Sequence, residues 1–143
     1  MRKIFKTTIL VFISVLLNAT QAKGQETKEF NWDSIIEAVI QVESKGNPNA
    51  YNKNGNCAGI LQITPGLVKQ CNRWLQAEKS EKRYTLQDRY DVEKSKEMFI
   101  LVQKYYNKKN DVEKAFRIWN GGPNYNVHKT NKYLAKCLRY YKK

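Results

Sequence analysis

An apolar helical stripe that ends in an acid is the feature that most constrains how this chain folds. Residues 33–44 read DSIIEAVIQVES, and Glu43 continues the helical spacing of three apolar residues, Ile36, Val39 and Ile40. A stripe of this kind must be buried against other elements, and Asp33 is the expected N-cap. The pattern therefore predicts a helix whose core-facing side carries a carboxyl at its C-terminal end.

The predicted position of Glu43 disfavours its ionised form for two reasons. Apolar neighbours partly desolvate the carboxyl, and the negative end of the helix dipole disfavours an anion by roughly 0.3 to 1 kcal/mol. A carboxyl that stays protonated near neutral pH can donate a proton to a substrate. The alternative is a glutamate that extends from the last turn of the helix into water.

The segment after this helix is rich in turn-forming residues. Gly46 is expected to close the helix, and Asn54-Gly55 is a typical two-residue hairpin turn. We expect the resulting β-ribbon to lead into a short strand, Gly59–Gln62. In that strand Leu61 would face the core and Gln62 the opposite side.

Four further helices are expected from apolar periodicity and capping residues. One runs from Pro65 to about Ala77, and a longer one begins at Asp91. A third begins with a capping-box-like Asn110 and ends at Trp119, and Thr130 caps the last. That last helix is expected to bury one face: Tyr133, Leu134, Cys137, Leu138 and Tyr141. These elements predict an α+β domain, mainly α, with a small β-ribbon.

Residues 1–24 have the pattern of an export signal. They combine a basic start, an apolar run of about eleven residues and a small-residue region suited to cleavage. A retained membrane helix is the alternative, but the run is shorter than the ~18 residues that a span requires. We expect residues 25–31 to be a flexible leader and residues 32–143 to form one domain, exported to the periplasm or cell envelope.

The chain is strongly basic, with a formal charge of +13. The first 24 residues carry four basic side chains and no acidic ones, so cleavage would leave +9. Such a surface attracts anionic polymers and lipid headgroups. No helix-turn-helix, zinc-ligand or RNA-binding motif accompanies the charge, so nucleic acid is not an expected partner and membrane contact is expected to be transient.

Five short motifs follow one another in a distinctive order. They are Glu43-Ser44, Asn47-Pro48, Gly59-Ile-Leu-Gln62, Asn120-Gly-Gly-Pro123 and Thr130-Asn-Lys-Tyr133. Over most of residues 33–140 this order resembles the catalytic domain of the soluble lytic transglycosylases, lysozyme-like enzymes that cut the peptidoglycan glycan. The resemblance implies a lysozyme-like fold, no cofactor and no metal. By family analogy, a secretion or conjugation apparatus is a further candidate partner.

The resemblance also implies a role for individual residues. Glu43 would be the catalytic acid and base. The expected contacts to the glycan or the carboxyl are Ser44, Gln62, Trp119, Asn120 and Tyr133. Trp119 stands where the family commonly has a tyrosine, and its indole N–H can donate but not accept a hydrogen bond. The alternative role for Asn120 is only to cap the preceding helix.

A single acid separates two enzyme mechanisms. Hydrolysing glycosidases usually pair two carboxyl groups, whereas one suffices if the substrate supplies the nucleophile. Asp88 and Asp91 are the nearest second acids, and both are expected in capping turns. The resemblance therefore favours a lyase that forms 1,6-anhydromuramoyl ends. A goose-type lysozyme-like hydrolase and a non-catalytic basic cell-wall-binding protein are the alternatives.

The remaining reactive side chains support no other chemistry. His128 is the sole histidine and has no second ligand at zinc spacing. Three cysteines allow at most one internal disulfide. Cys57 with Cys71 is the preferred pair, and reduced cysteines packed in the core are the alternative. Four aromatic residues at helical spacing are expected in the core rather than in a sugar site: Trp74, Tyr105, Tyr106 and Tyr141.

Overall fold

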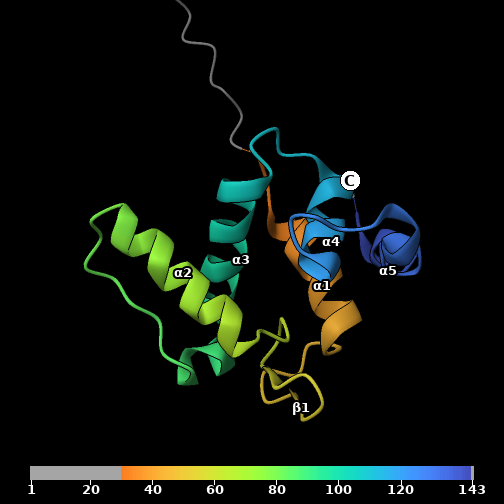
Figure 1. Cartoon of the computed structure of the whole chain (residues 1–143). Coiled ribbons are helices and arrows are strands. Elements are labelled where there is room, and N and C mark those ends of the chain that lie inside the picture. Colours follow the sequence, from red (N-terminus) through yellow and green to blue (C-terminus); the bar gives the residue numbers. More distant parts are fainter. Residues whose placement is uncertain (1–29, 143) are drawn as a thin grey trace, which may run out of the picture.

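The computed structural model describes residues 30–142, which form a mainly helical domain with a small antiparallel sheet (Figure 1). The elements in chain order are α1 (Asp33–Glu43), β1 (Tyr51–Asn52), β2 (Cys57–Ala58), α2 (Pro65–Ala77), η1 (Gln87–Tyr90), α3 (Val92–Tyr106), α4 (Val112–Gly121) and α5 (Val127–Tyr140). This confirms the predicted fold class. The predicted export signal and most of the predicted leader lie outside the described residues. Among the helices of residues 30–142, none has the length and apolar character that a membrane span needs.

Helix α1 lies at the centre of the fold. It packs against α4 and α5, and its predicted apolar stripe is buried. The prediction that Asp33 is the N-cap is wrong by one residue: Trp32 holds that position without a side-chain bond. The side chain of Asn31 satisfies the helix start instead, because its Oδ1 accepts from the backbone N–H of Asp33 at 2.8 Å.

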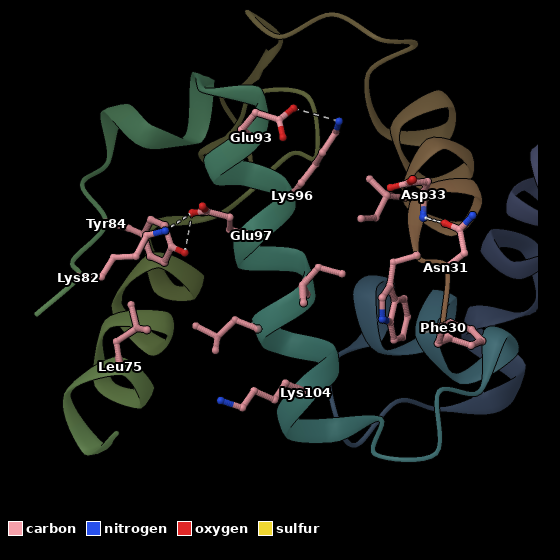
Figure 2. A pocket seen from close by; sticks show the side chains of 14 residues that line it. Phe30, Asn31, Asp33, Leu75, Lys82, Tyr84, Glu93, Lys96, Glu97 and Lys104 are labelled. Carbon is pink, nitrogen blue, oxygen red and sulfur yellow. Dashed lines mark hydrogen bonds and ion pairs between the residues drawn. The ribbon is translucent and has the colours of Figure 1, made fainter. Parts of the chain in front are cut away.

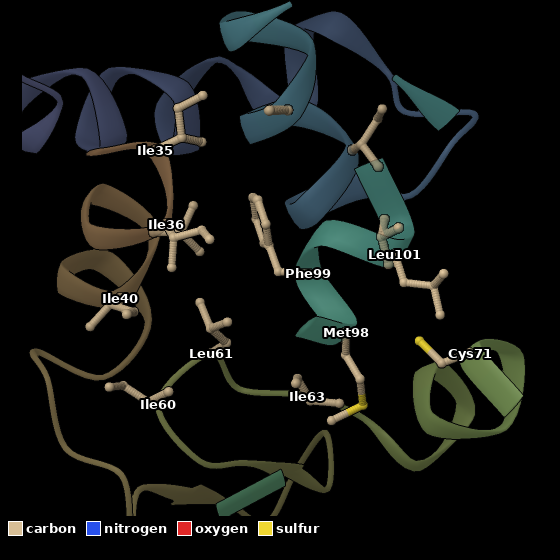
Figure 3. Packing of buried hydrophobic residues seen from close by; sticks show 14 of the residues in the cluster. Ile35, Ile36, Ile40, Ile60, Leu61, Ile63, Cys71, Met98, Phe99 and Leu101 are labelled. Atoms are coloured by element: carbon tan, nitrogen blue, oxygen red, sulfur yellow. The ribbon is translucent and has the colours of Figure 1, made fainter. Parts of the chain in front are cut away.

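The hydrophobic core lies between α1 and α3. Figure 3 shows Phe99 of α3 pointing toward Ile36 of α1, with Leu61 from the segment after the sheet close to both. Phe99 and Leu61 are fully buried. At about 25 cal/mol for each Å² of apolar surface removed from water, such side chains stabilise the fold by roughly 1.5–3 kcal/mol each. The carboxyl end of α1 is thus held by the core itself.

Helix α2 has the predicted limits, and α3 has the predicted start. Helix α2 runs from Pro65 to Ala77, and the Thr64 side chain caps it by accepting from the N–H of Leu67 at 3.2 Å. Asp91 caps α3 by accepting from the N–H of Lys94 at 2.9 Å. Both starts depend on contacts within four residues, which is why sequence alone predicts them.

The limits of α4 and α5 differ from the predictions. Asp111, not Asn110, caps α4, because its Oδ1 accepts from the N–H of Lys114 at 2.7 Å. Helix α4 then continues past Trp119 to Gly121. Asn126 caps α5, so Thr130 lies one turn inside the helix, where its hydroxyl donates to the Asn126 carbonyl at 2.9 Å.

The predicted ribbon is present, but its turn is longer than two residues. Tyr51 pairs with Ala58 and Asn52 with Cys57, so a four-residue loop, 53–56, joins the strands. Asn56 takes the left-handed conformation, with φ of 48°, whereas Gly55 does not. The prediction of a two-residue Asn54-Gly55 turn is therefore wrong.

The segment Gly59–Gln62 is a turn rather than a strand. The N–H of Gln62 donates to the Gly59 carbonyl at 3.1 Å, and Gln62 has a φ of 52°. Ile60 and Leu61 are both buried, which the alternation of a strand would forbid. Leu61 does face the core as expected, but the cause is the turn and not a two-residue period.

Two side-chain predictions are also corrected. All three cysteines are free thiols, so Cys57 and Cys71 form no disulfide; Cys71 and Cys137 are buried in the core. Leu138 was expected on the buried face of α5, yet half of its surface is exposed. Helix α5 packs against α1 and α4 along one narrow side, and Leu138 lies beyond the edge of that contact.

Candidate active site

A cavity of about 440 Å³ lies at the carboxyl end of α1. Glu43, the last residue of that helix, lines it together with residues from both strands and from α2, α3 and α4. Three residues with expected glycan contacts, Gln62, Trp119 and Asn120, line the same cavity. The fold therefore brings together side chains that are up to 77 positions apart in the chain.

Tyr133 of α5 holds the Glu43 carboxyl. Its hydroxyl donates to Oε1 of Glu43 at 2.6 Å, which is short for an O–H···O bond. Burial raises the pKa of the Glu43 carboxyl, while the Tyr133 hydrogen bond and the positive charge of Lys136 act in the opposite direction. Burial and then the neighbouring Glu43 charge raise the pKa of Tyr133, so its hydroxyl keeps the donated proton.

Arg117 positions the helix that carries Tyr133, and sequence reasoning missed it. Its guanidinium is buried and donates from Nη1 to the Thr130 hydroxyl and to the Val127 carbonyl, both at 2.8 Å. Its Nε donates to Glu113 at 2.7 Å. One side chain of α4 thus binds the first turn of α5. No sequence pattern identifies such a residue, because its partners are remote.

Gln62 lines the cavity, and its amide nitrogen is bound to the backbone. Its Nε2 donates to the carbonyls of Gly59 at 3.0 Å and Ala50 at 3.3 Å. Only the amide nitrogen can donate to a carbonyl, which fixes the orientation of the group. Within residues 30–142, no hydrogen bond is donated to Oε1 of Gln62. That oxygen is therefore available to accept from a ligand.

Buried Arg89 holds the turn that carries Gln62. Its Nη1 donates to the carbonyls of Asn56 at 2.7 Å and Ile63 at 3.2 Å. Its own carbonyl lies so close to Gly59 that a Cβ there would be 1.6 Å away. Gly59, with φ of 79°, is required for both its conformation and this contact. Arg89 is a second buried residue that sequence reasoning missed.

Ser44 also contacts this turn. Its hydroxyl donates to the Ile60 carbonyl at 2.8 Å, which links the end of α1 to the turn before Gln62. Ser44 is not among the side chains that line the cavity. Its expected contact with glycan stays a prediction.

Aromatic side chains form one wall of the cavity. Trp119 was expected there, and it packs against Phe99 with ring centroids 4.8 Å apart. Trp74 and Tyr106 were assigned to the core; they do pack together, but both also line the cavity. A helical period shows that a side chain faces inward, not whether a cavity opens beside it.

Polar residues form the rest of the lining. Asn120 lies inside α4 rather than at its cap, which is Gly122, so the reading of Asn120 as a helix cap is wrong. Its exposed side chain has no hydrogen bond within residues 30–142. Sequence reasoning missed three polar lining residues, Asn52, Thr64 and Gln70.

Glu43 is the only carboxyl that lines this cavity in the described part of the chain. Asp88 is occupied elsewhere: it accepts from the N–H of Thr85 at 2.7 Å and pairs with Lys94 at 2.6 Å. Asp91 caps α3. Both acids therefore have the capping roles that were expected. No three His, Cys, Asp or Glu side chains between residues 30 and 142 are grouped to hold a metal ion.

A larger cavity of about 780 Å³ lies on the opposite side of α3 (Figure 2). Two of its three carboxylates face lysines: Glu97 pairs with Lys82 at 2.5 Å and Glu93 with Lys96 at 3.1 Å. The third is Asp33, at the start of α1. The Tyr84 hydroxyl also donates to Glu97, at 3.1 Å. The two glutamates are neutralised by their neighbours, and Asp33 is exposed to solvent. Glu43, which is half-buried and forms no ion pair within residues 30–142, is the carboxyl suited to proton transfer.

A helical domain with a short hairpin and one half-buried acid in a cleft is a lysozyme-like protein. The chain matches the family model described as the transglycosylase SLT domain over residues 21–142, and it belongs to that family. Membership implies a lytic transglycosylase-type activity that cleaves peptidoglycan, and binding to its glycan strands. No curated protein and no solved structure is significantly similar to the chain.

Proposed function

We propose that this protein cleaves the β-1,4 bond between N-acetylmuramic acid and N-acetylglucosamine and leaves 1,6-anhydromuramoyl ends. The supporting observation is that Glu43 is the only carboxyl lining the cavity within residues 30–142, and that it is half-buried and held by Tyr133. A hydrolase of the usual kind would need a second carboxyl. A single acid suffices when a hydroxyl of the substrate is the nucleophile.

In the first step, protonated Glu43 donates its proton to the glycosidic oxygen as the bond from that oxygen to the muramoyl C1 breaks. The resulting carboxylate then accepts the proton of the muramoyl C6 hydroxyl. Oxygen O6 forms the new bond to C1. One bond is broken and one is formed, Glu43 ends in its starting state, and neither water nor a cofactor is consumed.

Tyr133 makes the two oxygens of Glu43 unequal. Its hydroxyl occupies Oε1, so the transferable proton belongs on Oε2. The same bond stabilises the carboxylate that forms after the first transfer. Raised by burial, the pKa of Glu43 favours the protonated form with which the reaction begins.

The glycan is held by the side chains around the acid. The free amide oxygen of Gln62 accepts from an N-acetyl N–H or a sugar hydroxyl, and Asn120 offers both a donor and an acceptor. The Trp119 ring provides an apolar face for a sugar. Ser44 keeps the Gln62 turn in place through the Ile60 carbonyl, and its hydroxyl oxygen can still accept one bond.

We place the enzyme in the periplasm or cell envelope as one exported domain. The pattern of residues 1–24 and the action of the family on the cell wall support this location. A secretion or conjugation machine that needs a local opening in the wall would be a suitable partner. Purification of the protein from the envelope fraction and sequencing of its N-terminus test the location.

Digestion of purified peptidoglycan tests the reaction. The wild-type protein should release anhydromuramoyl ends. The substitution Glu43→Gln should reduce the rate of this release by about 10²- to 10⁴-fold. Glu37→Gln is the matched control, since Glu37 is exposed on the same helix and bonds only to Gln41. New reducing ends would indicate a hydrolase, and no release by the folded wild type would indicate a binding protein.

A further inference from the structure

The outer face of α5 is positively charged without any compensating acid. Residues 121–142 contain five basic side chains and no aspartate or glutamate. The five are Lys129, Lys132, Lys136, Arg139 and Lys142, all of them exposed. The face also lies at one edge of the molecule, because α5 packs mainly against α1 and α4 (Figure 1).

The basic residues of α3, in contrast, are neutralised by neighbouring carboxylates. Helix α3 carries Lys94, Lys96 and Lys104, and each pairs with a carboxylate at 2.6 to 3.1 Å. None of the five basic residues of the α5 region forms an ion pair within residues 30–142. The α5 region therefore combines five basic side chains with no acidic one, and this local positive charge attracts an anionic partner.

Large apolar side chains are exposed on the same helix. Val127, Leu138 and Tyr140 are 51, 50 and 48% exposed, and they are three of the five large hydrophobic residues that are most exposed in the described chain. Val127 and Leu138 are three turns apart on one flank, with half-buried Leu134 between them. Tyr140 lies on the other side of the basic row.

We propose that the outer face of α5 binds the interface of an anionic lipid bilayer. A helix with lysines beside exposed aliphatic and aromatic side chains suits that interface, where the charges reach the headgroups and the apolar groups enter the acyl boundary. An anionic cell-wall polymer would match the lysines but leave Val127 and Leu138 in water. The proposal concerns an exposed surface and does not depend on Glu43 being catalytic.

Lysine acylation in the presence of vesicles tests the contact locally. The protein as purified from the envelope would be acylated with anionic phosphatidylglycerol vesicles or with neutral phosphatidylcholine vesicles. The rate at each lysine is then read by peptide mass spectrometry. Lys129 and Lys132 should react at least fivefold more slowly on anionic vesicles only, whereas exposed Lys69 and Lys109 should be unchanged. Uniform protection, or none, would overturn the proposal.

Matched variants separate charge from apolar insertion. The triple variant Lys129→Gln, Lys132→Gln, Arg139→Gln should weaken vesicle binding on the order of 100-fold, about fivefold for each charge. The control variant Lys69→Gln, Arg73→Gln, Lys109→Gln changes net charge equally on exposed positions elsewhere and should bind as the wild type does. Equal losses in both variants would show that only net charge matters and would refute a site on α5.

Leu138 distinguishes a bilayer from a polymer. Leu138→Gln should weaken binding to anionic vesicles about tenfold and leave binding to purified peptidoglycan unchanged. Leu86→Gln is the control, because Leu86 is equally exposed, at 51%, and is remote in sequence from α5. Vesicle binding that is unaffected by Leu138→Gln would mean that no apolar group enters the membrane, and the bilayer proposal would fail.

Discussion

The hydroxyl of Tyr133 lies 2.6 Å from Oε1 of Glu43, although the two residues are 90 positions apart in the chain. This bond joins the end of α1 to α5 across the inside of the fold. It stabilises the charged form of a carboxyl whose burial favours the neutral form. The balance of these two effects sets the pH range in which Glu43 can both give and take a proton.

Removal of the Tyr133 hydroxyl should shift the activity profile to higher pH. In Tyr133→Phe the carboxylate loses a stabilising donor, so the pKa of Glu43 should rise further. The loss of activity with rising pH, which reports that pKa, should then occur at higher pH. Rates on peptidoglycan across pH 4 to 9 would measure it, with Tyr125→Phe as control. If the loss of activity stays at the same pH or moves to lower pH, the hydrogen bond from Tyr133 has no electrostatic role.

Glu43→Gln should stabilise the folded protein at neutral pH. Because burial raises the pKa of this carboxyl, the folded state resists an ionisation that the unfolded chain undergoes freely. The penalty is absent below the unfolded pKa, near 4.3, and complete above the folded value. The variant should therefore gain Tm over wild type at pH 7 and lose that gain toward pH 4. A lower Tm at pH 7 would mean that the ionised carboxylate is stabilised by its partners.

Two glycines with nearly the same φ should respond very differently to alanine. Gly59 and Gly46 have φ of 79° and 83°, but only Gly59 has backbone against the site of a Cβ. Gly46→Ala should cost about 1–2 kcal/mol for the left-handed conformation. Gly59→Ala should cost about 3 kcal/mol or more, because the Arg89 carbonyl must move. Urea unfolding of both variants measures the difference; similar costs would contradict the close approach.

Substitutions at two adjacent residues of the Gly59–Gln62 turn should affect different properties, one stability and the other activity. Leu61 is fully buried, so Leu61→Ala should cost about 2–5 kcal/mol through the cavity that it leaves. Gln62→Ala removes bonds to two carbonyls and should cost only about 1 kcal/mol, but it should slow peptidoglycan cleavage. Melting curves and digestion rates on both variants decide this. Full activity in Gln62→Ala would remove Gln62 from the glycan site.

Local signals predicted much of the helical framework. The limits of α2 were predicted from Pro65 and the apolar stripe after it, and the start of α3 from Asp91, whose capping partner is three residues away. The same reasoning misplaced the start of α5, because Thr130 is a good cap by type but its hydroxyl bonds to Asn126 inside the helix. Where two nearby residues can both cap, the packing of the helix decides between them.

The amino-acid sequence alone determined the acid, the helical stripe that buries it and the family motifs, since these are properties of residue type and spacing. Only the tertiary structure decided how the site is assembled. The Gln62 turn exists because Gly59 meets buried Arg89, and Tyr133 reaches Glu43 because Arg117 ties α5 to α4. These contacts join segments far apart in the chain, and no local pattern encodes the packing that brings them together.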